Sequence, residues 1–173
     1  LHLLIIPNMH LASLAYIGPG QVPIMGHMFV VAEEMAKAGY MALSSNIVVH
    51  ADICAHYILN MGDEGQKQKY LPQMVSGDCI GCICMTEPGA GSDLQAIKTN
   101  AVADGDDYII NGQKTFITNG QHADLVILAV KTDPKAGARG TTLFLIDTHL
   151  DGFSRGRNLE KIGQHAGDTS ELY

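Results

Sequence analysis

The chain of 173 residues is long enough to bury a core as one domain or as two small domains packed together. Its 46% hydrophobic and 17% charged residues are typical of a folded protein and argue against a disordered one. The formal net charge of -7, with no basic stretch larger than the Lys67/Lys69 pair, argues against a nucleic-acid binder.

The first segment, Leu1 to Ile17, is almost entirely apolar, and the first charged residue is Glu33. Pro7 and several polar residues interrupt it, and it is shorter than the roughly 20 apolar residues of a membrane span. Because it also lacks a basic leader, a signal peptide is not indicated. We expect a buried pair of helices. The chain starts with Leu and stops after Tyr173 in mid-pattern, so we expect a fragment of a longer protein.

Apolar residues then recur at helical spacing as far as residue 78. A first helix presents one apolar face and ends at Gly39. The members of that face are Met28, Val31, Met35 and Ala38. A second helix is predicted from a cap at Ser44 or Ser45 toward Leu59.

A third helix is predicted after Asp63, which can cap it with Gln66 as its capping-box partner. Pro72 lies within this helix, so a kink or a break is expected there. These three predictions define a partial N-terminal helical domain, residues 1–78.

From Cys79 onward the residues favour strands. The predicted strands are Cys79 to Thr86, Asn100 to Asp104, Tyr108 to Asn111, Leu125 to Val130 and Thr142 to Ile146. Gly105 to Asp107 is a good hairpin loop, and Asn111-Gly112 and Asn119-Gly120 mark further tight turns. The last two strands are uninterrupted β-prone runs, which indicates burial on both faces. The sequence therefore predicts an α+β fold, in which the helical segment precedes an antiparallel β-barrel or sandwich at 79–173.

Four cysteines occur without a secretory signal, and three of them crowd into one segment, so free thiols in a reducing compartment are expected. Alternation along a strand would point Cys82 and Cys84 to one face and Cys79 to the other, which argues against a zinc site. We predict no metal. The eight histidines form no recognisable catalytic pattern.

The turn Gly89–Ser92 directly follows an apolar strand. Its glycines let the backbone present successive amide groups outward, which suits a pyrophosphate or a similar anion. Ser92 and Thr86 add hydroxyl donors. The turn is neither a Walker A loop nor a Rossmann fingerprint, and from the motif alone a plain surface turn fits equally well. Glu87 and Asp93 are unfavourable beside an anion unless they bind backbone amides or a base.

The run Cys84 to Asp93 resembles the signature of the acyl-CoA dehydrogenase family. Four further segments agree with that family in order and spacing: Gly65 to Pro72, Asn111 to Gly120, Gly152-Phe153 and Asp168 to Leu172. Within the family, Asp93 to Gln95 and Gly156 to Leu159 are most similar to the long-chain members. The residues before Gly20 depart from the family pattern.

The resemblance implies FAD held between the β-domain and a C-terminal helical domain. The implied flavin residues are Ile83, Cys84, Met85, Thr86, Glu87, Pro88, Gly89, Ala90, Gly91, Ser92, Phe116, Ile117 and Thr118. Thr86 would bond near the reactive edge of the ring, Gly91 and Ser92 would meet the pyrophosphate, and Phe116 would lie against the ring while Thr118 bonds its polar edge. Without the motif, Phe116 would be read as an ordinary core residue.

The resemblance also implies that Ser92 contacts the acyl-CoA and that Ala138 and Arg139 contact its CoA portion, although a solvated Arg139 fits its position equally well. The reaction would remove two hydrogens across the α,β bond of a fatty acyl thioester, with a carboxylate taking the α-proton and hydride passing to the flavin. The family places that glutamate after Tyr173, so no catalytic base is expected in this chain. Glu87 is expected to be structural instead.

The implied partners are a fatty acyl-CoA, an electron-transferring flavoprotein and three further copies in a homotetramer. The implied location is the mitochondrial matrix in a eukaryote or the cytoplasm in a bacterium. Two alternatives stay open from the sequence: a non-catalytic flavin- or partner-binding module of the same fold, and a related flavin oxidase.

Overall fold

The computed structural model describes residue 30 and residues 33–173. The expectations for Leu1 to Ile17, for the region before Gly20, and for Met28 and Val31 lie outside the described residues. The described end of the first helix agrees with the sequence: Gly39 has a left-handed φ of 87°, and its amide bonds the Ala36 carbonyl at 3.0 Å.

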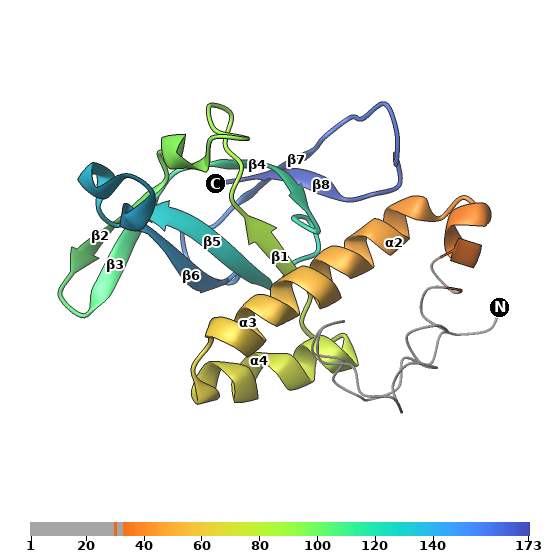
Figure 1. Cartoon of the computed structure of the whole chain (residues 1–173), viewed down its shortest axis with the longest axis horizontal. Coiled ribbons are helices and arrows are strands. Elements are labelled where there is room, and N and C mark those ends of the chain that lie inside the picture. Colours follow the sequence, from red (N-terminus) through yellow and green to blue (C-terminus); the bar gives the residue numbers. More distant parts are fainter. Residues whose placement is uncertain (1–29, 31–32) are drawn as a thin grey trace.

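The second helix is a long rod built from three parts (Figure 1). These are α2 (Met41–Val48), a π-helical turn (Val49–Cys54) and α3 (Ala55–Met61). The rod begins before the predicted caps, so that boundary was wrong, and the Ser45 hydroxyl instead donates to the Met41 carbonyl at 3.2 Å.

The π-helical turn carries His50, which joins the rod to its neighbours. His50 Nε2 lies 3.0 Å from the Met74 carbonyl, and the Gly81 amide donates to His50 Nδ1 at 3.0 Å. The π-helical turn is therefore tied both to α4 (Glu64–Ser76) and to β1 (Gly81–Cys84).

The third helix, α4 (Glu64–Ser76), has the predicted capping box. The Gln66 amide donates to Asp63 Oδ1 at 2.8 Å, and the Asp63 amide donates to Gln66 Oε1 at 3.0 Å. The helix runs through Pro72 as one element, so the predicted break does not occur. Gln73, the residue after Pro72, donates from Nε2 to the Lys69 carbonyl at 2.6 Å.

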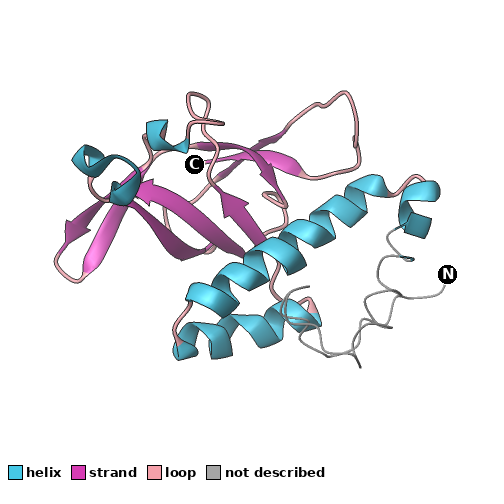
Figure 2. Ribbon diagram, viewed as in Figure 1, coloured by secondary structure: helices cyan, strands magenta, loops and turns pink. Residues whose placement is uncertain are grey.

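The strands form two sheets. The first contains β1 (Gly81–Cys84), β5 (Leu125–Lys131), β2 (Asn100–Asp104), β3 (Asp107–Asn111) and β6 (Thr141–Asp147). The second contains β4 (Lys114–Thr118), β8 (Thr169–Leu172) and β7 (Arg155–Asn158). The helices lie along one side of these strands (Figure 2), and the predicted α+β class is confirmed.

The pairing differs from expectation in one respect. β1 runs parallel to β5, with Gly81 opposite Leu125 and Cys84 opposite Leu128, so the larger sheet is mixed. No closed barrel is present among the residues that the structure describes.

The hairpin prediction is confirmed: β2 and β3 are antiparallel, and Gly105 has a left-handed φ of 63° at their turn. β5 is buried on both faces, as predicted, because it lies between β1 and β6 and under the helices. β6 was expected to be buried likewise, but it pairs only with β5, and Thr142 and Leu143 are exposed.

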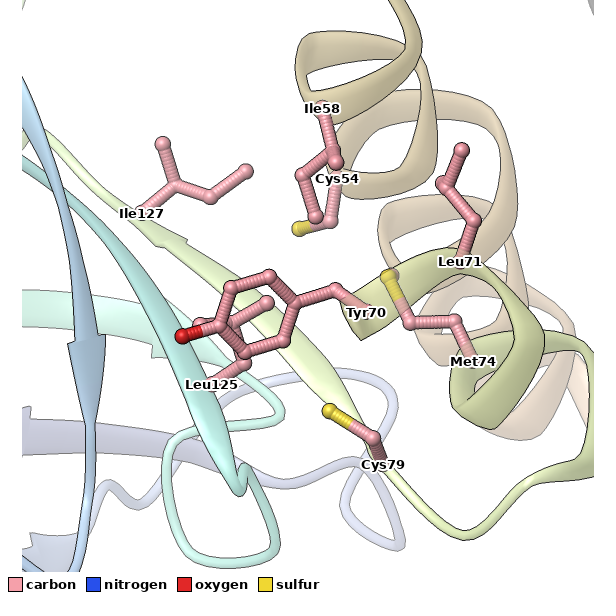
Figure 3. Close-up of a cluster of buried hydrophobic side chains, with 8 residues drawn as sticks. All are labelled: Cys54, Ile58, Tyr70, Leu71, Met74, Cys79, Leu125 and Ile127. Atoms are coloured by element: carbon pink, nitrogen blue, oxygen red, sulfur yellow. The ribbon is translucent and has the colours of Figure 1, made fainter. Parts of the chain in front are cut away.

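The main core joins the helices to the larger sheet (Figure 3). The Tyr70 ring extends from α4 toward the strands, among buried side chains from four elements and from the segment before β1. The members of this core cluster are Cys54, Ile58, Tyr70, Leu71, Met74, Cys79, Leu125 and Ile127.

A second core cluster lies on the opposite face of β1 and β5, against the smaller sheet. Its members are Cys82, Cys84, Ile117, Ala123, Val126 and Leu172. The predicted alternation of the cysteines is therefore confirmed, and all four thiols are free and buried. Within the described part of the chain no helix could cross a membrane, and no group of three or more His, Cys, Asp or Glu side chains gathers as a metal would need.

Candidate functional site

The Gly-rich turn follows β1 directly. The Glu87 amide donates to the Ala90 carbonyl at 2.9 Å and the Ala90 amide donates back to the Glu87 carbonyl at 3.1 Å, so residues 87–90 form a closed turn. Gly89, Gly91 and Ser92 are exposed, and a Cβ built on either glycine would meet nothing within 4 Å. In the described part of the chain no hydrogen bond engages the amides of these three residues. They are therefore free to bind an anion.

The buried side chain of Glu87 connects this turn to neighbouring segments. Its carboxylate accepts from the Lys98 amide at 2.7 Å, the Thr99 amide at 2.9 Å and the Lys114 ammonium at 2.9 Å. The ion pair is buried, with 3% of the Lys114 side chain and 6% of the Glu87 side chain exposed. Lys114 also donates to the Met85 carbonyl at 3.0 Å. Glu87 thus has the structural role that the sequence predicted.

The pKa values of this pair follow from burial and hydrogen bonding. Burial alone would raise the pKa of the Glu87 carboxyl, but the hydrogen bonds from Thr99, Lys98 and Lys114 together hold the pKa below its ordinary value of 4.5. Burial lowers the pKa of the Lys114 ammonium, and Glu87 offsets that effect only in part. The carboxylate is the better satisfied partner because it accepts three hydrogen bonds.

The second acid of the motif, Asp93, binds a backbone amide as well. Asp93 Oδ1 accepts from the Gln95 amide at 3.0 Å and begins a short 3-10 turn, Leu94–Ala96. Both acids are therefore occupied by backbone amides or a base, which was the condition for an anion-binding turn beside them.

The segment around Phe116 lies next to this turn. The Thr115 amide donates to the Thr86 carbonyl at 2.9 Å, so β4 runs beside the end of β1. Phe116 has a φ of 59° at an irregularity in the β4–β8 pairing, and 65% of its surface is exposed. Such a backbone conformation in a bulky residue costs on the order of 1–3 kcal/mol. The interpretation of Phe116 as an ordinary core residue is therefore wrong.

The other predicted flavin residues differ in how their side chains are placed. Pro88 is exposed, and Ile83, Met85, Thr86 and Thr118 are half-buried. Three predicted residues are closed off as side chains: Cys84, Ala90 and Ile117 are 0%, 4% and 2% exposed. These three are available to a ligand only through their backbone.

The predicted substrate residues lie on neighbouring loops. Ala138 and Arg139 are exposed within the turn Pro134–Gly140. That turn contacts Leu94–Ala96, and a Cβ on Gly137 would lie 3.7 Å from Gln95 Oε1. The structure thus brings the loop that bears Arg139 close to the loop that begins at Ser92.

Sequence reasoning missed Asp168, which organises the chain just after Thr118. The buried Asp168 carboxylate accepts from the Gln121 amide at 2.8 Å, from His122 Nδ1 at 3.0 Å and from the Ser170 hydroxyl at 2.8 Å. An isolated acid entering a strand was the signal that could have identified it. The role of Lys114 was also missed, because its partner Glu87 is 27 positions away in the sequence.

Comparison with known proteins agrees with these features. Residues 13–78 match a family model for the acyl-CoA dehydrogenase N-terminal domain, and residues 82–173 match one for the acyl-CoA dehydrogenase middle domain. A mitochondrial long-chain specific acyl-CoA dehydrogenase from Sus scrofa is 52% identical over 127 residues, which are 72% of this chain and 30% of that protein. The chain thus spans about a third of the length of its relatives.

Solved structures are also similar, and two serve as examples. The acyl-CoA dehydrogenase from Geobacillus kaustophilus has a TM-score of 0.73 and 57% identity, over 75% of this chain and 34% of that one. A glutaryl-CoA dehydrogenase from Mycobacterium smegmatis in complex with FADH2 has a TM-score of 0.72 and 37% identity, over 79% and 34%. The two family models together match more than half of the chain, and their ranges include all five segments that resemble the family in sequence. The chain belongs to the acyl-CoA dehydrogenase family.

Proposed function

We propose that this chain supplies the FAD-binding part of an enzyme that dehydrogenates long-chain fatty acyl-CoA thioesters. The observation that carries the proposal is the meeting of the two predicted flavin segments. The Thr115 amide bonds the Thr86 carbonyl, and the Lys114 ammonium bonds Glu87, so residues 83–92 and 116–118 border one surface. The free amides of Gly89, Gly91 and Ser92 and the exposed Phe116 ring suit a flavin dinucleotide.

In this proposal the chain binds and orients, and bound FAD supplies the hydride acceptor. Gly91 and Ser92 hold the pyrophosphate, and Thr86 and Thr118 bond the polar parts of the ring. Phe116 covers one face of the ring and limits access of water. Ser92, Ala138 and Arg139 meet the acyl-CoA.

The α-proton requires a carboxylate that the resemblance assigns to a C-terminal helical domain. Glu87 is unsuited to this role, because its oxygens already accept from Lys98, Thr99 and Lys114. In the same proposal, residues 1–78 belong to a helical domain and residues 79–173 form the flavin-binding β-domain.

The long-chain class rests on the 52% identity to the Sus scrofa protein, together with Asp93 to Gln95 and Gly156 to Leu159. A glutaryl-CoA dehydrogenase is also similar, so the experiment must compare a long-chain acyl-CoA with glutaryl-CoA as substrates. The proposal includes an electron-transferring flavoprotein as oxidant and a homotetramer. It places the protein in the mitochondrial matrix if the source is a eukaryote and in the cytoplasm if it is a bacterium.

The test uses the full-length protein. It should purify with a flavin absorption spectrum that bleaches anaerobically with palmitoyl-CoA and more slowly with glutaryl-CoA. A colourless protein that takes up no FAD would refute the cofactor, whereas faster bleaching by glutaryl-CoA would refute only the chain-length class.

A matched pair of serine variants tests the site itself. Ser92→Ala should lower flavin and acyl-CoA affinity, each by about tenfold or more, the loss of one hydrogen bond to a charged group. Ser76→Ala should change neither affinity, because Ser76 bonds Gln73 and Asp78 at the far end of α4. Equal behaviour of the two variants would contradict the assignment.

A further inference from the structure

Lys131, the last residue of β5, is a buried cation held by neutral groups. Only 5% of its surface is exposed. Its ammonium donates to the Gly137 carbonyl at 2.7 Å and to the Thr141 hydroxyl at 3.1 Å. Among the described residues no carboxylate forms an ion pair with it. Burial of an ammonium without a counter-charge costs free energy that an apolar side chain of the same length would avoid.

The two contacts of Lys131 fix the middle of the loop Pro134–Gly140. Gly137 breaks the helical geometry of this loop, with φ 59° and ψ -129°. Most other bonds of the loop lie at its base: the Thr132 amide donates to the Gly140 carbonyl at 3.0 Å, and the Lys135 amide donates to Asp133 Oδ1 at 2.9 Å. The Ala138 carbonyl accepts from the Thr141 amide. Lys131 is therefore the side chain that bonds the loop at Gly137, directly before Ala138 and Arg139.

The residues after Gly137 are Ala138 and Arg139, the proposed contacts of the CoA part of the substrate. Their loop packs beside Leu94–Ala96, and the Gln95 side chain faces Gly137. A change in the loop would therefore move Arg139 relative to Ser92, while Glu87, Lys114 and the flavin segments would keep their own bonds.

We propose that Lys131 is a positioning residue that holds the Pro134–Gly140 loop in place to bind the nucleotide end of acyl-CoA. The inference rests on the proposed function, since it needs Ala138 and Arg139 to face the substrate. It assigns to Lys131 no contact with flavin or with the thioester.

The experiment uses the full-length, FAD-loaded protein and three variants. Lys131→Met removes both donated bonds and keeps the length of the side chain. Lys131→Arg retains a donor and should restore part of the loss. Lys135→Met is the control, because Lys135 is exposed on the same loop and binds there through its backbone amide.

Lys131→Met should raise KM for a long-chain acyl-CoA by about tenfold, the loss of roughly one charge-assisted hydrogen bond. It should change kcat and FAD content less than about twofold, because only binding shared by the ground state and the transition state is lost. With the corresponding acyl-pantetheine, which lacks the nucleotide, KM should be the same for variant and wild type. Calorimetric titration with free CoA should show the same weakening as KM.

A purely structural role predicts something else: equal losses with acyl-CoA and acyl-pantetheine, or a loss of flavin. Either result would overturn the inference, as would an unchanged KM for acyl-CoA. If Lys131→Met fails to fold, Arg139→Gln and Lys131→Arg decide, because both should raise KM for acyl-CoA alone. Failure of the proposed function is seen separately, as absent FAD or absent turnover in the wild type.

Discussion

The ammonium of Lys114 lies 2.9 Å from the carboxylate of Glu87, in a pair whose side chains are 3% and 6% exposed. The two residues are 27 positions apart and belong to the two segments proposed to contact the flavin. A buried pair of this kind need not add stability over an apolar pair, but it is costly to break from one side, because the remaining charge stays buried. It also ties the Gly-rich turn to β4.

We expect Lys114→Met to destabilise the full-length protein by about 3–5 kcal/mol, since Glu87 would be left without its counter-ion. Chemical denaturation measures the change. The control is Lys67→Met, which removes an exposed pair with Glu64 at 2.9 Å and should cost less than about 1 kcal/mol. Equal losses in the two variants would show that the buried pair is not special.

Glu87→Gln should make stability less sensitive to acid. The folded-state pKa of Glu87 lies below its ordinary value, so the ionised carboxylate stabilises the fold at pH values above that ordinary value. This contribution is lost as the pH falls through the lower folded-state pKa. The gap in unfolding free energy between wild type and Glu87→Gln should therefore be widest near about pH 7 and shrink toward about pH 3. A gap that is the same at both pH values would contradict the role given to the carboxylate.

Phe116→Gly should separate backbone strain from ligand contact. Glycine adopts a φ of 59° without steric cost, so the flavin-free variant should be as stable as the wild type or more stable by about 1 kcal/mol. FAD affinity should fall by up to about tenfold, because the ring contact is lost. Differential scanning calorimetry and FAD titration give the two quantities.

Asn119→Gly is the matched variant, since Asn119 also has a left-handed φ, of 68°. Its side chain is buried and donates to the Asn46 carbonyl at 2.9 Å and the Gly81 carbonyl at 3.2 Å. This variant should lose about 1–3 kcal/mol of stability. If Phe116→Gly behaves like Asn119→Gly, the Phe116 ring has a packing role rather than a ligand role.

The four cysteines should resist alkylation in the folded protein. Burial raises the pKa of Cys54 and raises the pKa of Cys79 to about 11, and the hydrogen bond with Cys84, together with burial, raises the pKa of Cys82. Because the thiolate is the reactive species, iodoacetamide near about pH 8 should modify them only after denaturation. Peptide mass spectrometry reads each site, and rapid labelling of Cys82 or Cys54 in the native protein would contradict the buried arrangement.

Local features were predictable from the sequence because their partners are near in the chain. The capping box joins Asp63 to Gln66, and the β2–β3 turn needs only Gly105, so neither depends on the rest of the fold. The burial of β5 followed from its unbroken apolar run, but the same pattern misled for β6, whose exposure depends on having one neighbour instead of two.

Contacts between residues far apart in the chain could not be predicted from the sequence. The parallel alignment of Gly81 with Leu125 is set by the helices and the second sheet that cover the two strands. The site was predictable to the same degree. The need of Glu87 and Asp93 for amide or basic partners could be stated in advance, whereas Lys114 as that base and the left-handed Phe116 could not.

The core cluster around Tyr70 and Leu125 determines how the helices and the strands unfold. Its side chains come from residues on both sides of the boundary between the two family models, so neither part keeps this cluster intact alone, although the second core cluster lies wholly within residues 82–173. Cutting the chain near residue 79 would expose the same surface on both pieces. Helices and sheets should therefore melt together in one cooperative transition, and the helical part should be molten when expressed without the strands.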